Sequence, residues 1–303
     1  FLGKGVKLST SLRVTDDSVR GLFNINNPNF NYSNKSLSTT IESTNIDKLT
    51  DNGYETTKTG FSFGTGFEQY ENTYFRPSIS TYFEDLTTNS KASDNLKKQS
   101  GSYFDTTFNY NIDFDKRNQK FQTSEGSRFI FSQRVPLISE EFALMNSIDL
   151  QKWMKFNNEI ITSIGVYGKM INSLTDENVR ITDRLGLPRK KLKGFQYNAV
   201  GPVDAGDYVG GNYATAINFT STLPMIMPSF ESVDFKYFLD IGNVWGVDYS
   251  SSIDDSNKIR SSTGLGVEWF TPIGPMTFSL AQDISKASTD KTEGFQFNLG
   301  TTF

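Results

Sequence analysis

The feature that most limits how this chain can fold is the alternation of apolar and polar residues along many short segments. In SYFDTTFNYNIDFD, Phe104 and Phe108 alternate with Asp105 and Asn109. In SVDFKYFLDIGNVW, the aromatic and aliphatic residues alternate with acidic and basic ones in the same way. Successive side chains of a β-strand point to opposite faces, so this pattern predicts strands with one apolar and one polar face.

The alternation predicts an all-β chain of about fourteen strands in one domain, residues 1–303. The composition agrees, because 26 Phe and 13 Tyr are many for a chain of 303 residues, and aromatic residues favour strands. No segment has a convincing helical period, and no linker rich in Pro or Ser divides the chain. The expected strands lie near 5–14, 18–28, 34–44, 55–67, 72–85, 101–115, 126–136, 140–154, 158–171, 209–223, 231–246, 259–271, 274–286 and 293–303.

The connections between these segments alternate between short and long, and the longest covers about 172–208. Short turns on one rim and long loops on the other are typical of an antiparallel up-and-down transmembrane β-barrel. Strands of ~9–11 residues are enough to cross a membrane in such a barrel. A soluble β-protein is the alternative, but about fourteen strands enclose a lumen too wide for side chains to fill.

Composition excludes several classes of function. The chain has no Cys and no His, so it offers no thiolate or imidazole ligand for a metal and no Ser-His or Cys-His nucleophile. The net charge of -4 gives no indication of nucleic-acid binding. We therefore expect no metal, no cofactor and no enzymatic activity.

Several segments resemble, in family order, the transmembrane barrel of the BamA family of outer-membrane assembly factors. FDKRNQKFQTSEGSRF is similar to the family's turn with a D-x-R motif, and LGLPRKKLKGFQYNAVGP is similar to its long loop with an R-G-F motif. FLDIGNVW, GLGVEWFTPIGPMTFSLAQDI and GFQFNLGTTF are similar to its last strands. The resemblance covers nearly the whole chain and implies a fragment: about fourteen of the family's sixteen strands, without the periplasmic POTRA domains.

The resemblance also implies that the loop at 172–208 folds back into the lumen. Its motif is Lys193-Gly194-Phe195, in which Lys replaces the family's Arg. Lys193 is expected to contact Asp240 on the inner wall, and the family's second acidic position is expected at Thr220. Because Lys lacks the fork of Arg and Thr lacks a charge, this contact is expected to be weaker than in the family. The alternative is a loop exposed to solvent with Lys193 unpaired.

Two further sets of residues carry family roles. Asp115, Arg117 and Gly126 correspond to the D-x-R turn, which we interpret as structural, with a docking surface for a periplasmic partner as the alternative. In the last segment, alternating apolar residues are expected to form the closing strand and the β-signal that the assembly machinery reads. They are Phe295, Phe297, Leu299 and Phe303.

The resemblance implies a protein that folds and inserts β-barrel proteins into the bacterial outer membrane by strand templating and bilayer thinning. Its expected partners are outer-membrane lipids, unfolded outer-membrane proteins and, mostly through the missing domains, periplasmic assembly lipoproteins. A TamA-like or two-partner-secretion translocator of the same superfamily remains an alternative. A diffusion porin is a more remote one, because a porin has no need of the K-G-F loop.

Overall fold

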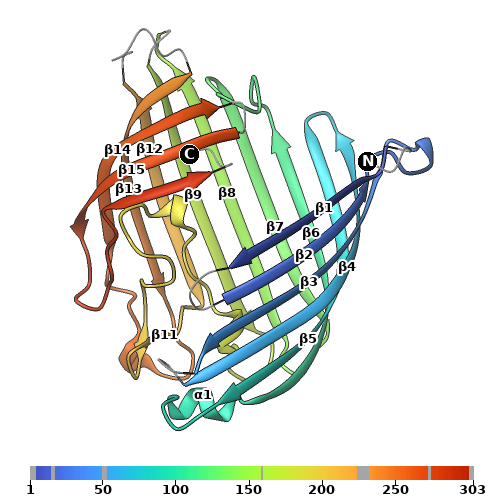
Figure 1. Cartoon of the computed structure of the whole chain (residues 1–303), viewed down its shortest axis with the longest axis vertical. Coiled ribbons are helices and arrows are strands. Elements are labelled where there is room, and N and C mark those ends of the chain that lie inside the picture. Colours follow the sequence, from blue (N-terminus) through green and yellow to red (C-terminus); the bar gives the residue numbers. More distant parts are fainter. Residues whose placement is uncertain are drawn as a thin grey trace.

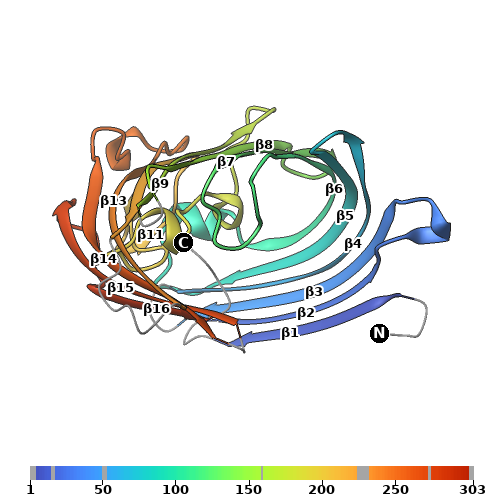
Figure 2. The ribbon, with the colours of Figure 1, turned by 90° about the horizontal axis from the view of Figure 1, so that it is seen from above.

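The structure is a computed structural model that describes residues 5–14, 18–49, 53–157, 160–223, 232–271 and 274–299. Fourteen strands form one antiparallel sheet in which neighbours along the chain pair with each other. The sheet curves into a barrel wall around an interior segment of the chain (Figures 1 and 2). Its strands are β1 (Lys7–Val14), β2 (Ser18–Asn27), β3 (Ser36–Lys48), β4 (Tyr54–Tyr70), β5 (Thr73–Thr88), β6 (Gly101–Asp115), β7 (Gly126–Ile138), β8 (Ala143–Lys155), β9 (Ile161–Ser173), β12 (Tyr213–Thr222), β13 (Val233–Trp245), β14 (Arg260–Thr271), β15 (Gly274–Ser285) and β16 (Phe295–Leu299).

Each of the fourteen predicted strands overlaps one strand of this sheet, so the predicted all-β barrel is confirmed. The loops contain structure that the alternation did not predict. A short helix, α1 (Asp94–Lys98), begins where the Ser93 hydroxyl accepts a hydrogen bond from the Leu96 amide. The remaining small elements are a hairpin of β10 (Val203–Asp204) and β11 (Asp207–Tyr208) and the single turns η1 (Phe30–Tyr32), η2 (Ile181–Asp183), η3 (Arg189–Lys191) and η4 (Ser251–Ile253).

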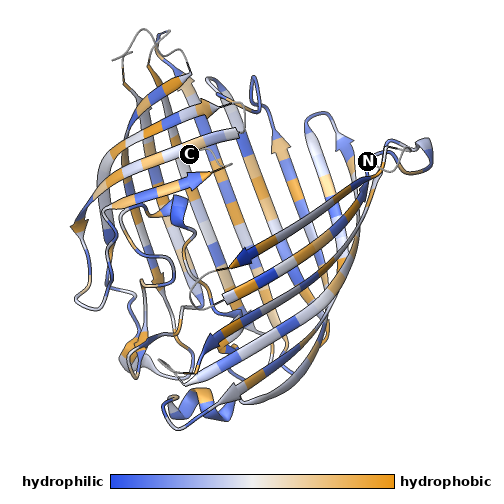
Figure 3. Cartoon of the chain, in the orientation of Figure 1, coloured by the Kyte–Doolittle hydropathy of each residue, from blue (hydrophilic) through white to orange (hydrophobic). Residues whose placement is uncertain are grey.

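The two faces of the sheet differ as the alternation predicts. On β6, Phe104 is 47% exposed on the outside, whereas the next residue, Asp105, is 7% exposed on the inside. The same alternation recurs along the wall (Figure 3). An apolar outer band is what a barrel in lipid requires. Between the two end strands, each strand is paired on both sides within the sheet. Among the described residues, no helix is long and apolar enough to cross a membrane.

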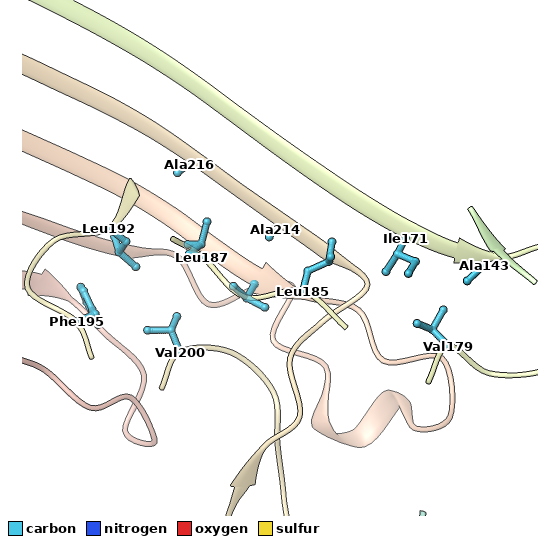
Figure 4. Close-up of a cluster of buried hydrophobic side chains, with 11 residues drawn as sticks. Ala143, Ile171, Val179, Leu185, Leu187, Leu192, Phe195, Val200, Ala214 and Ala216 are labelled. Carbon is cyan, nitrogen blue, oxygen red and sulfur yellow. The ribbon is translucent and has the colours of Figure 1, made fainter. Parts of the chain in front are cut away.

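A hydrophobic core lies inside the barrel, where the loop at 172–208 packs on the inner wall. The loop side chain Leu187 lies beside Ala214 and Ala216 of β12, and Phe195 belongs to the same buried cluster (Figure 4). These wall residues face the lumen, a side that is otherwise polar. The wall is therefore apolar where the loop covers it, which fixes the loop to β9, β12 and β13.

Strands β1 and β16 are the two edges of the sheet. They lie on the same side of the molecule (Figures 1 and 2), and within the described residues no ladder joins them. Along β16, Phe295 to Leu299 pair with β15. The residues that follow, including Phe303, lie outside the described part of the chain.

Candidate functional site at the docked loop

The site predicted from the K-G-F motif is a buried ion pair between the loop and the wall. Lys193 Nζ lies 2.9 Å from Asp240 Oδ2, and the Lys193 backbone amide donates to the same oxygen at 3.0 Å. Asp240 is fully buried and Lys193 is 6% exposed. The ammonium also lies 4.4 Å from the ring centroid of Phe238, which adds a cation–π contact. A charge removed from water needs such partners, and this lysine obtains them from one strand, β13.

Gly194 and Phe195 fasten the loop tip to the C-terminal strands. Gly194 has a φ of +86°, and a Cβ built on it would lie 2.9 Å from the Cβ of Ala281 on β15. The Lys193 carbonyl accepts from the Ser262 hydroxyl of β14. The Phe195 carbonyl accepts from Gln296 Nε2 of β16 at 3.0 Å. The motif thus contacts four consecutive strands, β13 to β16, which end at one edge of the sheet.

The second wall position differs from the prediction. Thr220 pairs with Phe238 in the β12–β13 ladder, whereas Asn218 is the residue opposite Asp240. Asn218 Nδ2 donates to Asp240 Oδ1 at 2.8 Å and to the Lys191 carbonyl at 2.9 Å. Thr220, the position expected from the resemblance, lies two residues further along β12 than Asn218. The neighbour of Asp240 on β12 is therefore an amide that donates to it, and Lys193 is balanced by a single acid.

A second docking point, which sequence reasoning missed, surrounds Arg180. Its side chain is 2% exposed. Its guanidinium donates to Asp105 at 2.7 Å, lies 3.6 Å from Glu84 and stacks 4.2 Å from the ring centroid of Tyr103. A buried charge of this kind joins the start of the loop to β5 and β6. The sequence contained one indication of this site, the acidic residues on the inward face of those strands. Buried acids of this kind need a cation from elsewhere in the chain.

Burial and the charges around Arg180 shift the pKa values of two loop carboxyls in opposite directions. Burial raises the pKa of Glu141, in the β7–β8 turn, to about 7, with Arg180 opposing the shift. Asp183 is also desolvated by burial, but Arg134, Lys58 and Arg180 outweigh this and hold its pKa well below its ordinary value. Asp183 is therefore the ionised centre of the cluster, while the charge of Glu141 depends on pH.

Two further buried arginines organise the loops around the same rim. Arg184 pairs with Asp248, and its Nη1 donates to Asn212 Oδ1 at 2.7 Å. Arg260 forms a fork with Asp290, with Nε–Oδ2 at 2.8 Å and Nη2–Oδ1 at 2.9 Å. Such bidentate pairs fix loop geometry as well as charge.

The D-x-R turn contains a bidentate ion pair between the Asp and the Arg of its own motif. Arg117 Nε and Nη2 donate to the two carboxylate oxygens of Asp115 at 2.8 and 2.7 Å. Gly126 has a φ of +111°, and a Cβ there would lie 2.2 Å from the Lys116 carbonyl oxygen. Only glycine allows the returning strand to approach the turn this closely. In the same turn, the Thr123 hydroxyl donates to the Gln119 carbonyl at 2.8 Å.

The closing strand has the predicted facing. Phe295, Phe297 and Leu299 are exposed on the outside, at 55%, 44% and 55%. Gln296, between them, is 3% exposed and points to the loop tip. Within the described residues, no group of His, Cys, Asp and Glu side chains could hold a metal ion.

The family of the chain follows from comparison with known proteins. The Omp85 superfamily domain matches residues 1–303. The chain belongs to the Omp85 superfamily. As an Omp85 barrel it is an outer-membrane β-barrel.

Its relatives confirm the resemblance to BamA. The outer membrane protein assembly factor BamA of Neorickettsia risticii is 23% identical over 218 residues, 70% of this chain and 29% of that protein. BamA of Neisseria meningitidis is 29% identical over 139 residues, 37% of this chain and 17% of that protein. The sorting and assembly machinery component 50 homolog of Mus musculus is 28% identical over 192 residues, 57% of this chain and 39% of that protein. This Omp85 chain therefore spans well under half the length of each.

Solved structures agree on the fold. The crystal structure of Haemophilus ducreyi BamA lacking POTRA domains 1–3 superposes with a TM-score of 0.86 at 20% identity, over 98% of this chain and 64% of that one. CdiB from Acinetobacter baumannii superposes with a TM-score of 0.56 at 12% identity, over 97% of this chain and 60% of that one. The chain thus corresponds to the barrel portion of BamA.

Proposed function

We propose that this Omp85 chain is the membrane part of a factor that folds and inserts other β-barrel proteins into a bacterial outer membrane. The relatives named as assembly factors support this, and so does one structural observation. Within the described residues, β1 and β16 end the sheet as unpaired edges. An unpaired backbone group costs several kcal/mol in lipid, so these edges favour the addition of another strand.

The proposed mechanism follows from the free-energy cost of unpaired backbone groups at a sheet edge in lipid. In this chain, a strand of an unfolded barrel protein pairs with the β1 edge, as an extended peptide adds to any exposed sheet edge. In a parent with further strands, the terminal strand would take that role. Each new pair satisfies backbone groups of both chains, which drives the next strand of the substrate into the membrane. The docked K-G-F loop keeps β13 to β16 in a fixed curvature while the β1 edge is occupied. No covalent chemistry, cofactor or metal is required.

The proposed partners are outer-membrane lipids and unfolded outer-membrane proteins. Local thinning of the bilayer beside the barrel is proposed as part of the same mechanism. Periplasmic assembly lipoproteins are proposed to act mostly on regions of the parent protein that this chain does not cover.

The test is reconstitution of the chain into phosphatidylcholine vesicles with a denatured outer-membrane barrel protein as substrate. We expect faster substrate folding than in empty vesicles. We also expect a Ser11→Cys variant, at the β1 edge, to form a disulfide with a cysteine in the substrate's last strand. The matched Ser62→Cys variant has its cysteine on β4, paired on both sides, and should not. No acceleration and no crosslink at Ser11 contradict the proposal.

A translocator of the same superfamily is distinguished by the same experiment. A TamA-like or secretion protein that exports its substrate leaves the polypeptide outside the bilayer. The assembly factor leaves it inserted and resistant to protease.

A further inference from the structure

A cavity of about 790 Å³ lies inside the barrel, between the docked loop and the wall. Arg13 of β1 lines it, and so do Gln296 and Asn298 of β16. The cavity therefore reaches both edge strands as well as the K-G-F motif. We refer to it as the edge chamber.

The edge chamber is strongly basic. Eight Lys and Arg side chains line it, against one carboxylate, Asp183. Five of the eight cations already have carboxylate partners. The pairs are Lys58–Glu84, Arg134–Asp183, Arg184–Asp248, Arg189–Glu293 and Lys193–Asp240.

The other three cations, Arg13, Lys169 and Lys190, form no ion pair within the described residues. Asp183, the one acid that lines the chamber, already pairs with Arg134 at 3.0 Å. The chamber thus carries an excess of about three positive charges that the described chain does not balance. Low-dielectric walls strengthen the field of such charges on an anion.

We propose that the edge chamber binds a phosphate-bearing anion. A diphosphate carries a negative charge similar in size to that of the three unpaired cations, and it carries that charge in one compact group. An acidic peptide needs several carboxylates spread along a chain. Lysine ammonium groups act as point charges on phosphate oxygens, and the side-chain amide of Asn298, which also lines the chamber, supplies a donor. Because the chamber meets both sheet edges, the phosphate can come from solution or from the headgroup of a lipid.

A further observation supports the site. Lys190 lies in η3, where burial and the neighbouring Lys191 lower its pKa. A bound anion offsets this electrostatic cost because it stabilises the charged form of Lys190. The proposal is separate from the assembly activity and holds or fails without it.

The first experiment titrates inorganic pyrophosphate into the chain in non-ionic detergent, by calorimetry at fixed ionic strength. We expect saturable binding at one site. Lys169→Gln and Lys190→Gln should each weaken it about tenfold, as loss of one charge-assisted hydrogen bond predicts. The matched control, Lys98→Gln with Lys155→Gln, removes two charges outside the chamber and should leave affinity unchanged. Lys169→Arg with Lys190→Arg keeps the charge and should retain binding, which separates charge loss from misfolding.

The second experiment identifies the source. The chain is purified from vesicles of equal parts phosphatidylglycerol and phosphatidylcholine, and native mass spectrometry identifies the retained lipids. Retention of phosphatidylglycerol that depends on Lys169 and Lys190 supports a lipid headgroup, whereas pyrophosphate binding alone supports a soluble anion. The proposal is overturned if neither probe binds, if binding ignores both lysines, or if only a glutamate-rich peptide binds.

Discussion

At the scale of single residues, the docked loop depends on a few buried charges that are paired with the barrel wall. Asp240 holds both the ammonium and the backbone amide of Lys193. Removing one member of a buried pair leaves the other uncompensated, whereas replacing both with apolar groups is often neutral.

Asp240→Ala should therefore loosen the loop at 172–208, at a cost of about 3–5 kcal/mol to its docking. Limited proteolysis of the membrane-inserted chain should cleave this loop faster. Asp94→Ala, which removes an acid whose side chain is 92% exposed, is the control and should change nothing. Lys193→Met combined with Asp240→Leu should restore much of the protection. An unchanged cleavage rate in Asp240→Ala contradicts the docking account.

Gly194→Ala should undock the loop tip for two reasons. Its φ of +86° costs an alanine about 1–2 kcal/mol, and the new Cβ meets Ala281 at 2.9 Å. Gly206→Ala isolates the first cost, because Gly206 has a φ of +87° with open space around it. We expect the larger loss of thermal stability for Gly194→Ala, and equal losses would show that the contact with β15 does not matter.

Glu141 should give the loop cluster a pH dependence. Its pKa is raised from 4.5 to about 7 by burial, so its ionisation is more costly in the folded chain than in the unfolded one. Its contribution to stability is full below pH 4.5 and is lost as the pH rises through about 7. The unfolding temperature should fall across this range, and Glu141→Gln should flatten that fall. An equal slope in the variant contradicts the assignment.

At the scale of elements, the strands were predictable and the loop contacts were predictable only in part. Alternation along β6 and β13 shows which side of each strand is apolar, because strand geometry alone decides it. The partner of Lys193 on β13 followed from the resemblance together with that facing. The neighbour of Asp240 on β12 could not be predicted in this way, because Asn218 and Thr220 share a face and only the ladder register distinguishes them.

The Arg180 cluster shows the limit more clearly. Arg180 lies 75 residues from Asp105 in sequence, and nothing local in either segment specifies the other. The apolar wall residues Ala214 and Ala216 likewise break the polar pattern of the lumen face for a partner that only the folded loop supplies.

The element most open to test is β16. Gln296 ties it to the loop tip through the Phe195 carbonyl. Gln296→Ala should destabilise the strand by about 1 kcal/mol and speed hydrogen exchange of its backbone amides. Asn298→Ala is the matched control, because Asn298 also faces inward but makes no side-chain hydrogen bond among the described residues. Equal exchange in the two variants argues against this tie.

At the scale of the whole molecule, the docked loop braces one end of the fourteen-stranded sheet from inside. The loop contacts β13 to β16 through its tip and β5 and β6 through Arg180. The wall is thereby held from inside, while β1 and β16 are the edges of the sheet within the described residues. An edge strand of this kind offers unpaired backbone groups to a further strand.

The most direct test of this central claim is a disulfide crosslink between the two edges of the membrane-inserted chain. Ser11→Cys on β1 is combined with Asn298→Cys on β16, both facing the lumen. Ser11→Cys with Leu22→Cys and Asn298→Cys with Thr277→Cys are positive controls, because each pair lies directly opposite in a ladder. The account predicts efficient disulfides in both controls and little between the edges. Efficient crosslinking of Ser11→Cys to Asn298→Cys would show a sealed barrel and contradict the account.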